Sequence, residues 1–177
     1  MVFELSFLFF VMHHISKSAI VPFSPQQMYE LVNNINDYPQ FLNWCEGASI
    51  LNQSDDQITA SVQINKGGLK QIFSTLNTLK PYRLIEMQLL DGPFEQLSGE
   101  WRFEPLGENA AKVFLDLKFK FKSKLLDISL SPIFTKIANS QLDAFVARAK
   151  KYTAKIIGFN KLYYRNLCNS LNSPSML

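Results

Sequence analysis

Residues 112–122 read KVFLDLKFKFK, and residues 134–156 read FTKIANSQLDAFVARAKKYTAKI. In the first stretch, apolar side chains alternate with mostly charged ones, which is typical of a strand with one buried and one exposed face. In the second stretch, apolar residues recur every three or four positions and form a single helical stripe. Its members are Phe134, Ala138, Leu142, Phe145, Ala149, Tyr152 and Ile156. We expect the strand and the helix to bury each other's apolar faces.

The chain before residue 112 predicts further strands. A first strand covers 16–21, and Ser24 followed by Pro25 is a helix start that leads to a short helix and a second helical turn at 37–41. Alternating or apolar stretches then recur between turn signals, over 58–65, 72–79, 83–90 and 97–104. The order is one strand, short helices, a run of further short strands and a long helix. This predicts an α+β fold, in which a curved antiparallel sheet of about seven strands wraps on the long C-terminal helix.

The two ends of the chain differ from the rest. Residues 1–11 (MVFELSFLFFV) are apolar, but they are too short to span a bilayer, which needs about 20 apolar residues. We interpret 1–11 as an N-terminal extension; a membrane-surface anchor is the alternative. Gly158 is predicted to end the long helix, and Pro132 to lie near its first turn. The predicted domain is therefore 12–157, followed by a tail over 158–177.

The residues that could carry chemistry are few. Two cysteines without a CxxC pair exclude a disulfide framework, and His13 and His14, the only histidines, should point to opposite faces of a strand. The sequence contains no nucleotide-binding, hydrolase or metalloprotease motif. We therefore expect no catalytic residues, no metal site and no required cofactor, and a function based on binding.

The charge is unevenly distributed along the chain. Residues 1–111 contain 6 Lys/Arg and 12 Asp/Glu, whereas residues 112–177 contain 12 Lys/Arg and 3 Asp/Glu. Such an excess of positive charge predicts contact with RNA or another polyanion, although a solvated surface is the simpler interpretation. The candidate contacts are Lys118, Lys120 and Lys122 on the strand, and Arg148, Lys151 and Lys155 on the helix.

Aromatic residues are abundant, with 15 Phe in the chain. One tryptophan and four phenylalanines fall on faces predicted to be buried: Trp101, Phe103, Phe119, Phe134 and Phe145. Core packing explains them, and a hydrophobic pocket for a lipid or a quinone-like molecule would also use them.

Several segments resemble the RatA family of bacterial ribosome-association toxins. They are ISKSAIVPFS (15–24), QMYELV (27–32), YPQFL (38–42), DGPF (91–94) and AFVARAK (144–150). The resemblance covers roughly 12–157 and extends to mitochondrial coenzyme Q-binding proteins and polyketide cyclase-like domains. It implies a START-like helix-grip fold.

The resemblance implies two functions. The first is a cytoplasmic toxin, paired with an antitoxin, that binds the large ribosomal subunit and its rRNA and blocks subunit association, so that translation initiation is inhibited. The second is a ubiquinone- or lipid-binding protein that supports respiration. An enzyme of the cyclase type rests on analogy of fold alone.

Overall fold

The computed structural model describes residues 12–171, without the side chains of Leu69 and of residues 153–171. Residues 1–11 of the expected extension and 172–177 of the expected tail lie outside the described residues. The elements are β1 (His13–Val21), α1 (Pro25–Asn33), the short 3-10 helix η1 (Ile35–Gln40), β2 (Cys45–Gln53), β3 (Gln57–Lys66), β4 (Leu69–Lys80), β5 (Leu84–Asp91), β6 (Phe94–Pro105), β7 (Ala111–Phe121) and α2 (Lys124–Leu171).

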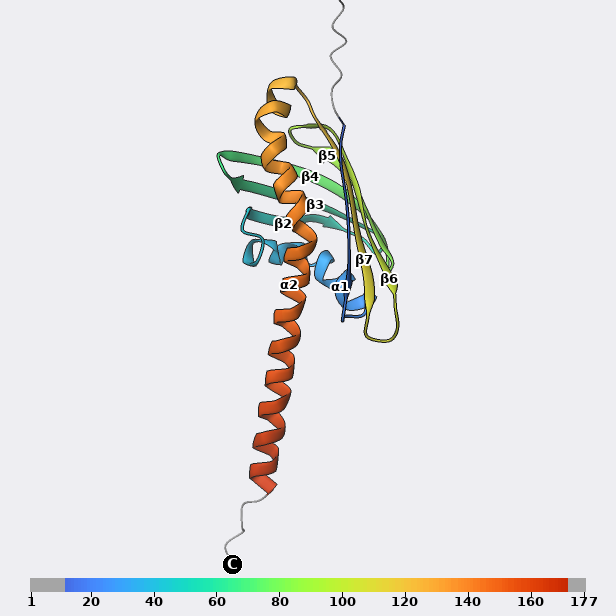
Figure 1. The fold of residues 1–177 in the computed structure, drawn as a ribbon, viewed down its shortest axis with the longest axis vertical. Helices are drawn as coiled ribbons and strands as arrows, with labels where there is room; N and C mark the ends of the chain where they lie inside the picture. The colour runs from blue at the N-terminus through green and yellow to red at the C-terminus, as the bar shows by residue number, and fades with distance from the viewer. Residues whose placement is uncertain (1–11, 172–177) are drawn as a thin grey trace, which may run out of the picture.

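Seven antiparallel strands form one sheet in the order β1-β7-β6-β5-β4-β3-β2. After β1, the chain passes through α1 and η1 to the opposite edge at β2 and then returns strand by strand to β7. Figure 1 shows the sheet curving around α2, which crosses its concave side. The predicted helix-grip fold is confirmed.

The core lies between the concave face of the sheet and α2. Alternate residues of β7 point into it, since Val113, Leu115, Leu117, Phe119 and Phe121 are all buried. The helical stripe is buried from Phe134 to Ala149, but Tyr152 is 41% exposed and the side chain of Ile156 is not described. The two patterns that predicted the fold therefore contact each other as expected.

Glycines allow a tight turn and a close approach of two strands in the sheet. Gly67 and Gly68 join β3 to β4 with φ values of 59° and 84°, which favour glycine in a tight hairpin turn. On β6, a Cβ at Gly99 would lie 2.7 Å from the carbonyl oxygen of Asp116 on β7. A larger residue at this position would separate two strands that carry much of the core.

The long helix differs from the prediction at both ends. It begins at Lys124, so Pro132 lies inside it and not in its first turn, and the hydrogen bond lost there costs about 3 kcal/mol that the packing of the flanking residues can offset. It also continues through Gly158 to Leu171, contrary to the predicted end. One interior glycine costs a helix only about 1 kcal/mol, which neighbouring helix-forming residues can offset. No helix among the described residues is long and apolar enough to cross a membrane.

Candidate functional site

The concave sheet, η1 and α2 line a cavity of about 70 Å³ that is partly open to solvent. Its wall is mainly apolar, but β4 contributes Thr75 and Asn77, and α2 contributes Gln141. Thr75 and Asn77 are buried, and the Thr75 hydroxyl donates to Asn77 Oδ1 at 2.9 Å. This pair was not predicted from the sequence. Their spacing between Phe73 and Leu79 would have placed them on the inward face of the strand.

Trp44 adds a hydrogen-bond donor to the cavity. It lies between η1 and β2, is 5% exposed and lines the cavity. Its indole Nε1 has no hydrogen-bond partner among the described residues. A buried donor without a partner costs about 1–3 kcal/mol, so a molecule with an acceptor oxygen would find a favourable contact there. We call Trp44, Thr75, Asn77 and Gln141 the polar wall.

The titratable groups at the cavity are poorly suited to acid–base chemistry. Burial raises the pKa of Tyr38 far above its ordinary value, and its hydroxyl donates to the carbonyl oxygen of Val32 at 2.6 Å. Nearby, burial raises the pKa of the Cys45 thiol to about 11 despite its hydrogen bond to Gly47. A thiol with this pKa is protonated at neutral pH and is a weak nucleophile.

The five predicted pocket residues are all buried, but only Trp101 and Phe134 line the cavity. Phe119 packs edge-on against Phe134, with ring centroids 4.7 Å apart, and Phe145 packs against Trp101 at 5.1 Å. Phe103 packs against Tyr29 at 5.7 Å. The rings fill most of the concave space, which explains why the cavity is small. The role of these residues in ligand binding stays a prediction.

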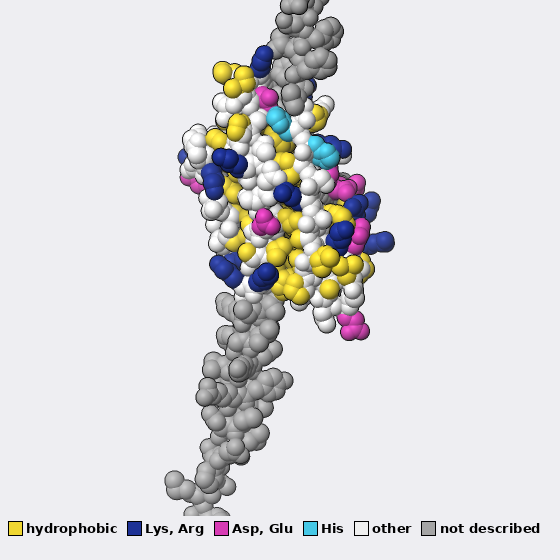
Figure 2. Space-filling model, viewed as in Figure 1, with side chains coloured by type: hydrophobic (Ala, Val, Ile, Leu, Met, Phe, Trp, Pro, Cys, Tyr) yellow, Lys and Arg dark blue, Asp and Glu magenta, His cyan; other side chains and the backbone are white. Residues whose placement is uncertain are grey.

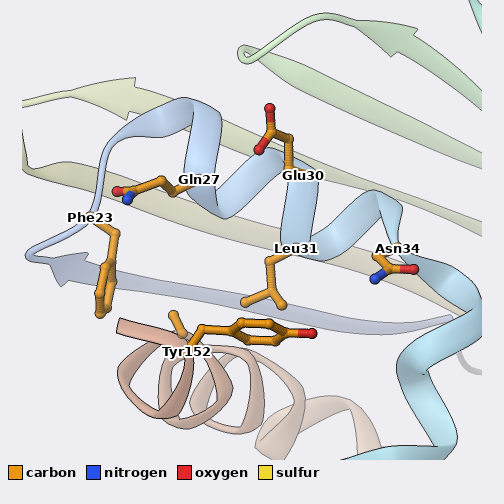
Figure 3. A pocket seen from close by; sticks show the side chains of 7 residues that line it. Phe23, Gln27, Glu30, Leu31, Asn34 and Tyr152 are labelled. Atoms are coloured by element: carbon orange, nitrogen blue, oxygen red, sulfur yellow. The ribbon is translucent and has the colours of Figure 1, made fainter. Parts of the chain in front are cut away.

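A larger groove, of about 270 Å³, lies between α1 and α2. Figure 3 shows Leu31 above the ring of Tyr152, with Phe23 at one end and Gln27, Glu30 and Asn34 along α1. The groove is open to solvent, and its α2 side leads to residues whose side chains are not described. We therefore take the interior cavity, which is less open than the groove and has convergent polar groups, as the candidate ligand site.

The six predicted phosphate contacts fall into two groups. Lys118 and Lys122 are exposed, whereas Lys120 is 20% exposed and pairs with Glu95 at 2.9 Å. Lys118 and Lys120 lie on the outer face of the sheet, because they alternate with the buried residues of β7, and Lys122 directly follows this strand. The other three are on α2, which covers the opposite face. The pattern therefore does not form one continuous basic surface, and Figure 2 shows Lys and Arg side chains at several separate places on the side where α2 lies.

Arg148 holds α2 against η1. Its guanidinium donates to Gln40 Oε1 at 2.7 Å, lies 3.8 Å from Asp37 Oδ2 and sits over the ring of Phe41. Since it is also only 18% exposed, its main contacts are internal. Lys151, one turn away, is exposed; the side chain of Lys155 lies outside the described residues.

The two histidines bind carboxylates on different elements. His13 Nε2 lies 2.8 Å from Asp127 Oδ1 and 3.0 Å from Ser131 Oγ, and His14 Nε2 lies 2.8 Å from Asp116 Oδ2. Ser131 and Asp127 both contact Nε2 of His13, whereas in a catalytic triad the serine and the aspartate bind different ring nitrogens of the histidine. The first contact therefore fixes the start of β1 to the start of α2. The described residues contain no cluster of His, Cys, Asp or Glu that could hold a metal ion.

Comparison with known proteins relates this architecture to a family. Residues 21–146 match the family described as polyketide cyclase / dehydrase and lipid transport. The ribosome association toxin RatA of Pseudomonas aeruginosa is 43% identical over 138 residues, which are 78% of this chain and 96% of that protein. RatA of Escherichia coli K12 is 42% identical over 82% of this chain and 92% of its own length. The chain belongs to the RatA family.

More distant relatives place the RatA fold in a wider group. The mitochondrial coenzyme Q-binding protein COQ10 of Drosophila melanogaster is 26% identical over 77% of this chain and 58% of that protein. The Zhui aromatase/cyclase from Streptomyces superposes with a TM-score of 0.71 at 17% identity, over 81% of this chain and 96% of that one. An 18 kDa protein from Caulobacter crescentus superposes with a TM-score of 0.65 at 31% identity, over 80% and 99% of the two chains. The low identity to the cyclase shows a shared fold only.

Proposed function

We propose that this protein is a non-enzymatic toxin that binds the large ribosomal subunit and blocks its association with the small subunit, so that translation initiation is inhibited. The observation that carries the proposal is the 42–44% identity to RatA proteins over more than nine-tenths of their length. The proposal places the protein in the cytoplasm, with an antitoxin protein as its neutralising partner.

A binding role fits the chemistry of the interior. Tyr38, which lines the cavity, and the nearby Cys45 have raised pKa values and would stay protonated at neutral pH. General acid–base catalysis needs a group whose pKa is near the working pH. Cyclase activity is therefore not proposed, although cyclases share the fold.

Exposed lysines are the best candidates for contacts with rRNA. Lys118, Lys122 and Lys151 are exposed, whereas Arg148 and Lys120 already bind side chains of the protein itself. Phosphate contacts release counterions, so affinity should fall steeply as the salt concentration rises. We assign the phosphate contacts to these three lysines and to Lys155.

The test is co-sedimentation with purified large subunits over a salt series. A Lys118→Gln, Lys122→Gln, Lys151→Gln triple variant should bind more weakly, and the slope of log affinity against log salt should fall by about one for each lost contact. The matched control replaces Lys17, Lys70 and Lys80, also exposed, with Gln. Equal binding and slopes for both triples would refute the lysine assignment.

The same assay tests the function independently of the lysines. Added to separated subunits, the wild-type protein should reduce the peak of joined ribosomes in a sucrose gradient and migrate with the large subunit. If it migrates with neither subunit and leaves joining unchanged, the proposed toxin function is wrong.

The second candidate function is binding of ubiquinone or a lipid. It is favoured by the similarity to COQ10 and by the unpaired indole N–H of Trp44, which could donate to a quinone carbonyl. Pockets that hold drug-sized ligands are about 300–1,000 Å³, so the cavity of about 70 Å³ would have to widen on binding. Extraction of the purified protein with organic solvent should then yield a quinone or lipid in near-stoichiometric amount, and an empty extract would argue against this function.

A further inference from the structure

The first two turns of α2 are apolar on both sides. Leu126 and Leu130 pack against the core, whereas Leu125 and Ile128 are 77% and 66% exposed. Ser123 accepts a hydrogen bond from the backbone N–H of Leu126 and helps to fix the start of the helix. Large apolar side chains that are exposed together on a surface helix often mark a site of contact with protein or lipid.

The start of β1 adds to the same surface. His13 binds Asp127 in the first turn of α2, and Met12, directly before it, is 44% exposed. The sequence that precedes Met12 has nine apolar residues among its first eleven. Leu125 and Ile128 therefore form an exposed apolar patch, and the exposed Met12 lies one residue from the His13–Asp127 contact at the same end of α2.

Positive charge borders the patch. Lys122 and Lys124 are exposed and have no ion pair among the described residues, whereas the nearby carboxylates of Asp127 and Glu95 bind His13 and Lys120. Figure 2 shows hydrophobic side chains with Lys or Arg beside them at the end of the molecule where α2 begins. An apolar surface bordered by lysines suits the interface of a bilayer with anionic headgroups.

We propose that this end of the molecule docks on an anionic phospholipid surface, with Leu125, Ile128 and Met12 in the headgroup–acyl boundary and Lys122 and Lys124 on the phosphates. This surface is distinct from the interior cavity, and it shares only Lys122 with the residues assigned to rRNA.

Flotation of the full chain with vesicles tests the proposal. The protein should float with vesicles of phosphatidylglycerol and phosphatidylcholine, and much less with phosphatidylcholine alone. Leu125→Ser with Ile128→Ser should lower the partition coefficient by at least about tenfold, because two large side chains no longer enter the bilayer. The matched control is Ile20→Ser with Leu106→Ser, because both residues are exposed and lie away from the patch. Ile20 is at the end of β1 that is far from Met12, and Leu106 directly follows β6.

A second pair of variants tests the charge. Lys122→Gln with Lys124→Gln should reduce flotation on anionic vesicles, whereas Lys17→Gln with Lys80→Gln should not. All four double variants replace exposed residues, so their melting temperatures should stay near that of the wild type, which separates loss of docking from loss of folding.

Three results would overturn the proposal. One is equal flotation of the wild type and the Leu125→Ser, Ile128→Ser variant. Another is equal flotation on anionic and neutral vesicles. The third is a protein that does not float but forms dimers that this variant dissociates, because the patch would then be a contact between two copies of the chain.

Discussion

Under α2, the sheet surface formed by β6 and β7 is filled with aromatic rings, whereas the surface formed by β3 and β4 leaves a cavity with polar groups on its wall. The aromatic half consists of Phe94, Trp101, Phe119 and Phe121 of the sheet together with Phe134 and Phe145 of α2, all at most 4% exposed. The polar wall contains a buried Thr–Asn pair and an indole N–H without a partner. Both regions lie beneath the same helix.

The difference indicates that the aromatic half contributes to stability, whereas the polar wall is suited to binding a ligand. Packed rings lose little by burial and gain many contacts, so the aromatic half stabilises the fold. A buried N–H without a partner instead costs about 1–3 kcal/mol. Local features that lower stability without a compensating contact are often found where a protein binds another molecule.

The largest effect is expected in the aromatic half. Phe145→Asp should lower the free energy of unfolding by about 4 kcal/mol or more, because it removes a fully buried ring and leaves an unpaired charge in its place. Such a loss is a large part of the total stability of a typical domain. Urea unfolding followed by circular dichroism would measure it.

The control for Phe145→Asp lies on the same helix. Ala147 is exposed, so Ala147→Asp should change the free energy of unfolding by no more than about 0.5 kcal/mol. A Phe145→Asp variant that melts with the wild type would show that α2 does not pack against the sheet as described.

Replacing the polar pair should have a smaller effect on stability. Thr75→Val together with Asn77→Leu removes both partners of one hydrogen bond, so the free energy of unfolding should stay within about 1 kcal/mol of the wild type or rise. Asn77→Leu alone should be less stable than the double variant, because Thr75 then loses its acceptor. If the double variant is instead as unstable as a large core truncation, the polar pair is structural and the contrast between the two halves fails.

The fold was predictable because two periodicities in the sequence are unambiguous. The alternation over 112–122 and the stripe from Phe134 identified the facing surfaces, and both depend only on which side chains avoid water. The ends of α2 were not predictable, because Pro132 and Gly158 are local signals whose cost a long helix can bear.

The candidate site was predictable only in part. Aromatic residues on an inward face indicate burial, but the sequence does not show which rings fill space and which border it, as Phe119 and Trp101 illustrate. The internal role of Arg148 depends on Asp37 and Gln40, more than a hundred residues away, so no local pattern could reveal it. The same holds for the contact of His13 with Asp127.

The contact of His13 with Asp127 closes one end of the aromatic half, because the imidazole also stacks on Phe119 with ring centroids 4.8 Å apart. Burial tends to raise the pKa of Asp127, but hydrogen bonds from Ser131 and His13 and the charge of His13 outweigh it, so the pKa lies below its ordinary value of 3.8. A lowered folded-state pKa means that the carboxylate stabilises the fold above its ordinary titration range. This contribution is lost as the pH falls through the folded-state pKa.

The smallest expected effect is therefore a pH-dependent one. At neutral pH, Asp127→Asn should lower the free energy of unfolding by about 1 kcal/mol. The gap between variant and wild type should narrow as the pH falls below 3.8 and close only below the lower folded-state pKa, where both proteins carry a neutral side chain. Asp116→Asn is the matched control: its carboxylate lies 2.8 Å from His14, as Asp127 does from His13, but this histidine is 50% exposed. Solvent screens such a pair, so the control should differ from the wild type by less than about 0.5 kcal/mol at every pH. Thermal melts of the three proteins from pH about 3 to 7 would decide the matter, since a gap for Asp127→Asn that does not narrow on acidification would mean that shape, and not charge, holds β1 to α2.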